Sequence, residues 1–343
     1  MEKKSKSSCG FAALKHTINT LVEKDHIPVR YGKIFTNFFT SYHTVLTEQG
    51  KDFDSLVPLF QTFLKSVQEQ FASPYQFKPI HHAIRSPFDY YQLGIDLLLP
   101  LVDLPASTAS GLDHLQTIVN QLDQRENIIL FANHQIEADP QAISILLQNH
   151  APAFAENLFF VAGTRVTSDP LAIPFSMGRN LICIHSKKYI STPPEKQHEK
   201  QLHNKRTLGK MVTLLDEGGH AIYVAPSGGR DRVDETGNVA VAPFDPQSIE
   251  LFYLMTKKAQ RRTHFYPLAL STHHLLPPPE TTEIEIGESR ITRGSAIHLQ
   301  FGAPIDMEDF PGSEKAHNKK DKKALRTHFI WNQVKNDYAH FPE

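Results

Sequence analysis

The chain has 343 residues, of which 40% are hydrophobic and 21% are charged. This composition is typical of a folded globular protein, and the length is enough for one large domain or two domains of unequal size. Lysine and arginine number 36 and aspartate and glutamate number 37, which gives a formal net charge of -1. A chain without a net positive charge has no overall attraction for nucleic acid, so we expect no nucleic-acid partner.

The two cysteines and nineteen histidines of the chain bear on whether it has a disulfide framework or a metal site. Its two cysteines, Cys9 and Cys183, argue against a disulfide scaffold and against a structural zinc site. The adjacent histidines at 81–82 and 273–274 lack partners at the spacing of a zinc site. We therefore expect no metal and no cofactor.

The sequence also predicts where the protein is located. The apolar stretch near the N-terminus is shorter than that of a signal peptide, and no apolar run approaches the ~20 residues that cross a bilayer. We expect a soluble cytoplasmic protein, or one of the plastid stroma if the chain comes from a plant, although no transit peptide is recognisable.

Residues 9 to about 73 have apolar side chains at intervals of three and four, which is the period of an amphipathic helix. Three apolar stripes, within residues 11–22, 34–46 and 56–71, predict three or four helices joined by short connectors. We expect their many aromatic side chains to form a core rather than line a cofactor site. Residues 1–80 are thus predicted to be an N-terminal helical bundle domain.

From about residue 127, apolar runs of five or six residues alternate with helical segments, which is typical of an α/β fold. Buried strands are predicted at 128–132, 158–162, 181–185 and 221–225, and helices at 140–148, 200–215 and 247–260. Later strands, some of them antiparallel, are predicted at 265–271, 282–286 and 296–301. We expect residues 81–343 to form a larger catalytic α/β domain with a mixed, partly parallel sheet flanked by helices.

A histidine and an aspartate follow the first of these strands. Because Pro140 favours the first position of a helix, His134 and Asp139 both fall in the turn between strand and helix. A turn lets the carboxylate fold back onto the imidazole, where it fixes the tautomer and leaves the other nitrogen to take a proton from a hydroxyl. The alternative is structural, with Asp139 as a helix N-cap and His134 as a polar residue at a strand end. Glu137 is a second carboxylate in this turn.

Cationic side chains follow the third and fourth predicted strands. Lys188 comes after the third, and Arg230 and Arg232 come after the fourth, beyond a glycine turn. Loops at the carboxyl ends of parallel strands line one crevice, so we expect these cations to converge with His134. Residues two apart in an extended loop project to the same side, which suits the two arginines to clamp one phosphate.

A histidine base beside a phosphate clamp indicates a hydroxylated phosphate ester whose hydroxyl attacks an acyl carbonyl. Each cation alone is more simply a solvated surface group, and Asp231 or Asp234 offers the arginines a nearby ionic partner. The signatures of nucleotide hydrolysis and of serine hydrolysis are absent. Ser227 lacks the first glycine of a nucleophile elbow, which leaves a serine hydrolase as a distant alternative.

These motifs resemble those of the soluble glycerol-3-phosphate acyltransferases of plant plastids and related bacteria, within the glycerolipid acyltransferase superfamily. His134 and Asp139 match the H-x4-D motif of that superfamily. The resemblance spans roughly residues 86–305 and includes the stretches 86–91, 161–165, 178–183, 186–188, 225–232, 277–279 and 284–287.

The resemblance implies a glycerol-3-phosphate 1-O-acyltransferase. This enzyme would transfer a fatty acyl group from acyl carrier protein or acyl-CoA to the sn-1 hydroxyl of glycerol 3-phosphate, the first step of phospholipid synthesis. By this resemblance His134 is the general base, Asp139 orients it, and Lys188, Arg230 and Arg232 bind the phosphate. The family pattern has a histidine after the second lysine, whereas this chain has tyrosine at position 189.

Two other functions stay open: a 1-acylglycerol-3-phosphate acyltransferase, whose pocket holds a second acyl chain, and a non-catalytic phosphate- or lipid-binding protein. An acidic acyl carrier protein would dock on a basic surface such as residues 315–326, although a solvated helix face explains that stretch more simply. Weak membrane contact would help to release a lipid product, but no segment requires it. Backbone N–H groups of residues 228–229, or of the helix after Asp139, are candidates to bind the oxyanion.

Overall fold

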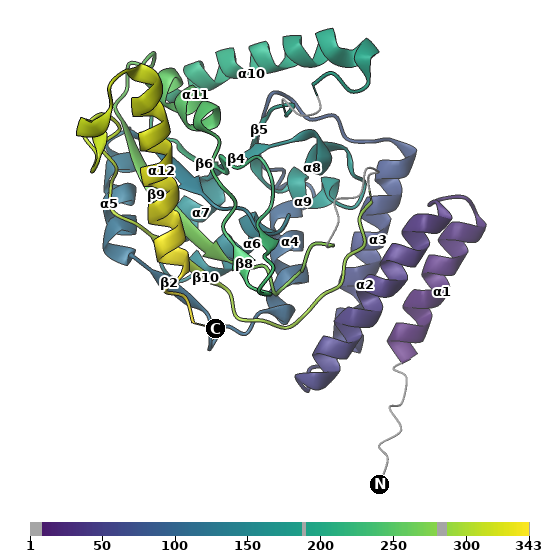
Figure 1. The fold of residues 1–343 in the computed structure, drawn as a ribbon. Coiled ribbons are helices and arrows are strands. Elements are labelled where there is room, and N and C mark those ends of the chain that lie inside the picture. Colours follow the sequence, from purple (N-terminus) through teal and green to yellow (C-terminus); the bar gives the residue numbers. More distant parts are fainter. Residues whose placement is uncertain (1–8, 187–189, 280–286, 343) are drawn as a thin grey trace.

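The computed structural model describes residues 9–186, 190–279 and 287–342 (Figure 1). Three helices, α1 (Cys9–Glu23), α2 (Val29–Glu48) and α3 (Val57–Ala72), form the predicted N-terminal bundle, with a 3-10 turn η1 (Asp54–Leu56) between the last two. Phe39, Tyr42 and Phe60 are fully buried and their rings pack against one another. The aromatic side chains of the bundle are therefore core residues, as predicted.

The bundle packs against the rest of the chain through α3 and α2. Helix α3 contacts α4 (Tyr90–Leu98) and α9 (Ile173–Met177). The hydroxyl of Tyr42 on α2 donates a hydrogen bond to the carbonyl oxygen of Leu97 at 2.9 Å. One cluster of buried hydrophobic side chains includes residues of the bundle and of the sheet. The division of the chain into two domains at residue 80 stays a prediction.

The described residues form a mixed sheet of eight strands in the order β1-β5-β4-β6-β3-β9-β10-β2. Strands β5, β4, β6, β3 and β9 run parallel, while β1 is antiparallel to β5, and β10 is antiparallel to β9 but parallel to β2. The strands are β1 (Ile80–His81), β2 (Thr108–Ser110), β3 (Asn127–Ala132), β4 (Phe159–Ala162), β5 (Asn180–Cys183), β6 (Ala221–Val224), β9 (Thr263–Ser271) and β10 (His298–Phe301). The predicted α/β class and partly parallel sheet are confirmed.

Helices cover both faces of this sheet, so successive residues of a central strand are buried on opposite sides. In β3, Ile128 and Leu130 belong to the core that includes the bundle, whereas Ile129 and Phe131 belong to a second core. Helices α10 (Gln197–Glu217), α11 (Pro246–Thr256) and α12 (Lys319–Tyr338) supply buried residues to the second core. The remaining helical segments are α5 (Leu112–Asp123), α6 (Asp139–Leu147), α7 (Pro152–Asn157), α8 (Thr164–Ser168), η2 (Leu99–Leu101), η4 (Pro194–Lys196) and η5 (Ser313–Lys315).

The predicted elements match the observed ones within a few residues at each end. Helix α10 ends at Glu217 and is capped by Gly218, whose φ of 70° lies in the left-handed region. A β-carbon there would lie 2.2 Å from the carbonyl oxygen of Arg125, so only glycine fits this tight reversal. The predicted strand at 282–286 lies outside the described residues. The elements that were not predicted include helices α4, α5, α7, α8, α9 and α12 and the short strands β1 and β2.

Candidate active site

The strands β4, β6, β3 and β9 are parallel, so their carboxyl ends lie at the same edge of the sheet. The segments that leave this edge are residues 133–138 after β3, residues 225–231 after β6 and residues 272–273 after β9, while α8 follows β4. This edge therefore brings together side chains from distant parts of the chain, as the rule for parallel sheets predicts.

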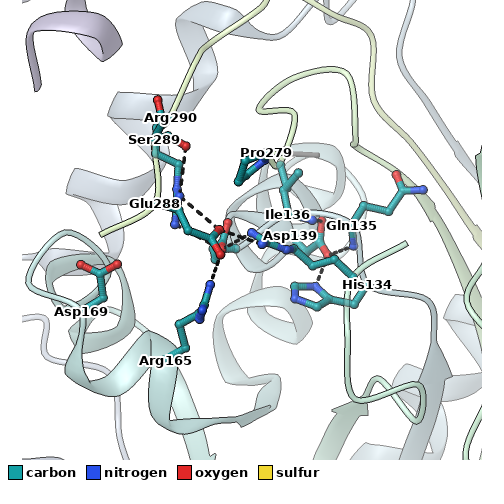
Figure 2. A network of polar contacts seen from close by, with 12 residues as sticks. His134, Gln135, Ile136, Asp139, Arg165, Asp169, Pro279, Glu288, Ser289 and Arg290 are labelled. Atoms are coloured by element: carbon teal, nitrogen blue, oxygen red, sulfur yellow. Dashed lines mark hydrogen bonds and ion pairs between the residues drawn. The ribbon is translucent and has the colours of Figure 1, made fainter. Parts of the chain in front are cut away.

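His134 and Asp139 meet in the loop after β3 (Figure 2). The imidazole Nδ1 lies 2.8 Å from the carboxylate Oδ2 of Asp139. The same carboxylate accepts the backbone N–H of Gln135 at 2.8 Å, the N–H of Ile136 at 3.3 Å and the hydroxyl of Thr272 at 2.6 Å. The Asp139 side chain is 1% exposed and that of His134 is 29% exposed. The aspartate is therefore a buried anchor, whereas the imidazole still reaches the surface.

The structural alternative for Asp139 is wrong. Helix α6 begins at Asp139 and its N-cap is Ala138, which makes no side-chain capping bond. The Asp139 carboxylate instead accepts N–H groups of Gln135 and Ile136, which precede the helix. The carboxylate thus folds back along the loop and lies within hydrogen-bond distance of the histidine, as the turn allows.

This environment prepares the imidazole to take up a proton. Burial lowers the pKa of His134, but the hydrogen bond to Asp139 and the negative charges of Asp139 and Glu137 outweigh it and raise the pKa above its ordinary value. With Nδ1–H directed at the carboxylate, Nε2 is the nitrogen left to accept a proton.

The residues on either side of His134 fix the loop to the end of β9. The amide of Asn133 donates to the carbonyl oxygen of Leu270 and accepts its N–H, both at 2.8 Å. The Gln135 carbonyl accepts the N–H groups of Thr272 at 2.6 Å and His273 at 2.9 Å. Two buried amide side chains thereby bind the loop to the backbone of a strand that lies far along the chain.

Asp231 does not pair with the flanking arginines, so that alternative is wrong. Its side chain is fully buried and accepts bonds from Asn133 at 2.8 Å, from Gln135 at 3.2 Å and from the N–H of Ala242 at 2.9 Å. Burial raises the pKa of Asp231 to about 6, against the hydrogen bonds that favour its charged form. The carboxylate of Asp234 is also occupied elsewhere, by Thr236 and Asn238 in its own turn.

The guanidinium of Arg230 lies between two carboxylates beside the histidine loop. Its Nη1 is 2.5 Å from Oε1 of Glu137 and its Nη2 is 2.7 Å from Oε2 of Glu288. The Arg230 side chain is only 7% exposed, so the simple interpretation of a solvated surface cation is wrong for this residue. Burial of Glu137 alone would raise its pKa, but the charges of Arg290 and Arg230 outweigh this effect and lower the pKa.

Two further arginines complete this cluster. Arg165 on α8 donates to Oε1 of Glu288, and Arg290 approaches Oε2 of Glu288 at 3.5 Å and Oε1 of Glu137 at 3.2 Å (Figure 2). We call Arg165, Arg230, Arg290, Glu137 and Glu288 the arginine cluster. It carries three positive and two negative formal charges, so its net charge favours an anionic ligand.

The roles of Arg165, Glu288 and Arg290 were not predicted. Arg165 follows the strand predicted at 158–162 and falls in one of the stretches that carry the family resemblance. Glu288 and Arg290 follow the strand predicted at 282–286 and another such stretch. The sequence thus contained a signal for each residue, but it did not show that segments so far apart along the chain meet in space.

The other two predicted phosphate ligands are Arg232, which the structure describes, and Lys188, which it does not. Arg232 lies at the start of β7 (Arg232–Val233), which pairs with β8 (Val239–Ala240), and its Nη1 donates to the carbonyl oxygen of Pro279 at 2.9 Å. Lys188 and Tyr189 lie outside the described residues. Among the predicted site residues, the structure therefore brings together His134, Asp139 and Arg230 through Glu137, and a role for Lys188 stays a prediction.

A match to a family model identifies the class of protein to which the chain belongs. A family model described as Acyltransferase matches residues 109–271, which include β3, the loop with His134 and Asp139, and β9. The matched segment thus contains the center of the site described above.

Chloroplastic glycerol-3-phosphate acyltransferases are similar over most of the chain. The relative from Pisum sativum is 39% identical over 320 residues, which cover 92% of this chain and 70% of the relative. A relative from Cucurbita moschata is 38% identical over 296 residues, which cover 85% of this chain and 64% of the relative. One from Spinacia oleracea is 40% identical over 266 residues, which cover 77% of this chain and 56% of the relative. The chain belongs to the family of these glycerol-3-phosphate acyltransferases, which confirms the resemblance. It spans less than two thirds of the length of the Cucurbita and Spinacia relatives.

Proposed function

We propose that this protein is a glycerol-3-phosphate 1-O-acyltransferase. It transfers a fatty acyl group from acyl carrier protein or acyl-CoA to the sn-1 hydroxyl of glycerol 3-phosphate and releases 1-acyl-sn-glycerol 3-phosphate. The observation that carries the proposal is the His134 imidazole, hydrogen-bonded to the buried Asp139 carboxylate, beside a cluster of arginines with excess positive charge. The similar proteins are named glycerol-3-phosphate acyltransferases, which supports acyl transfer to glycerol 3-phosphate.

In the proposed mechanism His134 is the general base. Its Nε2 takes the proton of the sn-1 hydroxyl as the oxygen attacks the thioester carbonyl, and the Asp139 carboxylate stabilises the imidazolium that forms. Collapse of the tetrahedral intermediate breaks the carbon–sulfur bond, and the imidazolium returns the proton to the leaving thiolate. Asp139 is held by four hydrogen-bond donors, so the imidazole has a fixed direction before the substrate binds.

Arg230 is proposed to hold the phosphate of the acceptor. The guanidinium is connected to the histidine loop through Glu137, so a phosphate bound there places the attached glycerol near the imidazole. Binding at two points makes attack on the acyl carbonyl close to intramolecular. Arg232 and Lys188 are proposed as further phosphate ligands because they lie in segments that follow β6 and β5.

The proposed oxyanion donor is the backbone N–H of Gly229. The N–H of Gly228 already donates to the carbonyl oxygen of Ala225 at 3.2 Å. The first N–H groups of α6 after Asp139 are also occupied, because Pro140 has none and those of Gln141 and Ala142 donate to the carbonyl oxygen of Ala138 at 3.0 Å. Gly229 is therefore the better candidate, and a β-carbon added to it would meet no heavy atom within 4 Å.

The acyl donor and the location remain parts of the proposal. The basic stretch at 315–326 is partly neutralised within the chain, because Lys322 pairs with Glu308 at 2.7 Å and Arg326 pairs with Glu250 at 2.9 Å. We therefore keep acyl carrier protein and acyl-CoA as equal candidates, and weak membrane contact as an aid to product release. None of the described helices combines the length and apolar character needed to span a bilayer. We propose the cytoplasm, or the plastid stroma in a plant, as the location.

The test is transfer of a labelled acyl group from acyl carrier protein or CoA to glycerol 3-phosphate. Parallel reactions contain 1-acylglycerol 3-phosphate or no acceptor. Product that depends on glycerol 3-phosphate supports the proposal. Preference for 1-acylglycerol 3-phosphate would establish the later acyltransferase instead, and binding of the phosphate ester without any transfer would establish a binding protein. Thioester hydrolysis that is lost in Ser227→Ala would indicate the hydrolase.

A further inference from the structure

We propose that Glu288 is a positioning residue that orients the guanidinium of Arg230 for the acceptor phosphate, and that helix α2 of the N-terminal bundle holds Glu288 in place. The inference rests on the proposed function, because it assigns the substrate phosphate to Arg230. It concerns a carboxylate that touches no substrate itself.

Glu288 lies at the center of the arginine cluster. Its side chain is 1% exposed, and its two oxygens have different partners: Oε1 accepts from Arg165, while Oε2 lies 2.7 Å from Arg230 and 3.5 Å from Arg290. One carboxylate thereby joins arginines from three segments, α8, the loop after β6 and the segment at 288–290. Charge-assisted bonds of this kind fix geometry more strongly than neutral ones.

The bonds to Glu137 and Glu288 fix the orientation of the Arg230 guanidinium. A guanidinium is planar and has five N–H donors in a fixed arrangement, so two bonds at Nη1 and Nη2 set the direction of the others. Glu137 accepts from Nη1 and Glu288 accepts from Nη2. Without Glu288, the guanidinium keeps only the bond to Glu137 and turns about it. The remaining donors then lose the fixed direction that a bidentate phosphate contact needs.

The backbone before Glu288 is fixed by the N-terminal bundle. The N–H of Gly287 donates to Asp169 at 3.2 Å, and its carbonyl oxygen accepts from Arg30 of α2 at 3.0 Å. Gly287 has a φ of 89°, and a β-carbon at this position would lie 2.8 Å from the ring of Tyr31, also on α2. Gly287 is thus held between the bundle and the sheet domain, and Glu288 follows it directly.

A second contact of α2 lies a few residues further on. Ser41 accepts the N–H of Thr292 at 3.0 Å, and the two hydroxyls are 3.1 Å apart. Both ends of the segment 287–292 are therefore hydrogen-bonded to one helix of the bundle. This arrangement gives the bundle a direct influence on the phosphate site, from a helix that contributes no residue to the arginine cluster.

A competing interpretation makes the opposite prediction. If Glu288 only occupied Arg230 until the phosphate displaced it, removal of its charge would strengthen binding of glycerol 3-phosphate. The fixed backbone on its N-terminal side and the bonds to two other arginines favour a permanent partner over a displaced one. The direction of the change in affinity therefore decides between a positioning residue and a competitor.

The experiment compares Glu288→Gln with the wild type and with a matched control, Glu250→Gln. Glu250 is also paired with a buried arginine, Arg326, but lies on α11 outside the arginine cluster. Steady-state kinetics give KM for each substrate and kcat, and calorimetry gives the Kd of glycerol 3-phosphate without an acyl donor. For Glu288→Gln we expect KM and Kd for glycerol 3-phosphate to rise roughly tenfold or more, with donor KM unchanged and kcat within about threefold. Glu250→Gln should change none of these values.

A second variant, Arg30→Met, tests the link to the bundle and is useful if Glu288→Gln does not fold. We expect a smaller rise in KM for glycerol 3-phosphate, with donor KM unchanged. An unchanged or lower KM and Kd in folded Glu288→Gln, or an unchanged KM in folded Arg30→Met, overturns the corresponding part of the inference. If the wild type transfers no acyl group, the proposed function fails by itself. The Kd values still test Glu288, and equal Kd values for wild type and Glu288→Gln, or no binding by either, overturn its role.

Discussion

Asp231 donates its main-chain N–H to the carbonyl oxygen of His134 at 2.7 Å. This bond joins the segment after β6 to the loop after β3, and the buried Asp231 carboxylate adds bonds from Asn133 and Gln135. The histidine is thus held through its own backbone and through both neighbouring side chains. Arg230 directly precedes Asp231, so the same bond also sets the spacing between the base and the proposed phosphate ligand.

The change Asp231→Asn should weaken this arrangement. In asparagine an NH2 group replaces one of the two acceptor oxygens and faces either the donors of Asn133 and Gln135 or the N–H of Ala242, so at least one buried bond is lost. We expect the free energy of unfolding to fall by about 1–3 kcal/mol, measured by urea denaturation, and kcat to fall with it. The control is Asp234→Asn, at an exposed turn, which should leave kcat unchanged.

The wild type and Asp231→Asn should also differ in how their stability depends on pH. The pKa of Asp231 is raised to about 6 in the folded protein from 3.8, so its contribution to stability is complete below 3.8 and is lost as pH rises through 6. The asparagine lacks this dependence. The stability deficit of Asp231→Asn should therefore shrink between pH 4 and pH 7, and a deficit that grows over that range would contradict the raised pKa.

Removal of the base is the most direct test of the mechanism. His134→Ala should lower kcat by about 10²- to 10⁴-fold, the usual contribution of a general base. The imidazole lies in the loop after β3 and is partly exposed, so the melting temperature should stay close to that of the wild type. Labelled acyl transfer measures the rate, and a rate near that of the wild type would show that another group removes the proton.

The pH profile should report the raised pKa of His134. The neutral imidazole is the active form, so kcat/KM should rise with pH through that pKa, and the midpoint should lie above the ordinary value of a histidine. In Asp139→Asn the hydrogen bond to a charged partner is lost, so the midpoint should move to lower pH while the maximal rate falls. If the midpoint of the pH profile is the same in Asp139→Asn as in the wild type, the rise of kcat/KM with pH reports a group other than His134.

Thr272→Val tests the support of the aspartate. The variant keeps the shape of a buried side chain but removes the hydroxyl that donates to Asp139 at 2.6 Å. We expect a lower kcat and a loss of about 1 kcal/mol in the free energy of unfolding. Thr207→Val is a matched control, because its buried hydroxyl donates to the carbonyl oxygen of Cys183 at 2.9 Å, away from the cluster. A similar fall in kcat in both variants would mean that only stability is affected.

Arg230→Lys should separate the two substrates. Lysine keeps the charge but cannot bind Glu137 and Glu288 through two nitrogens and hold a phosphate bidentately as well. KM for glycerol 3-phosphate should rise roughly tenfold or more, while KM for the acyl donor stays unchanged. Equal losses for both substrates would instead point to a disturbed fold, because two buried carboxylates depend on this arginine.

The sequence allowed the central strands and the histidine–aspartate pair to be predicted, because each depends on neighbouring residues. The apolar run of β3 marks a buried strand, and Pro140 marks the start of the next helix. Strand β2 has only three residues, without an apolar run, and was missed. The position of β9 between β3 and β10 depends on pairing between distant segments, and so does the meeting of Glu288 with Arg165, 123 residues away.

The late position of β9 in the chain affects how the protein acquires its site during synthesis. The loop with His134 and Asp139 leaves the ribosome well before β9, and Thr272 follows Asp139 by 133 residues. Until β9 arrives, one edge of β3 is unpaired, and the amides of Asn133 and Gln135 lack their backbone partners. A nascent chain that ends before residue 263 therefore contains the histidine and the aspartate but lacks the Thr272 hydroxyl and the backbone groups of residues 270–273 that bind Asn133 and Gln135. The proposed activity should appear only after the last parallel strand has joined the sheet, which makes acyl transfer a measure of the completion of cotranslational folding.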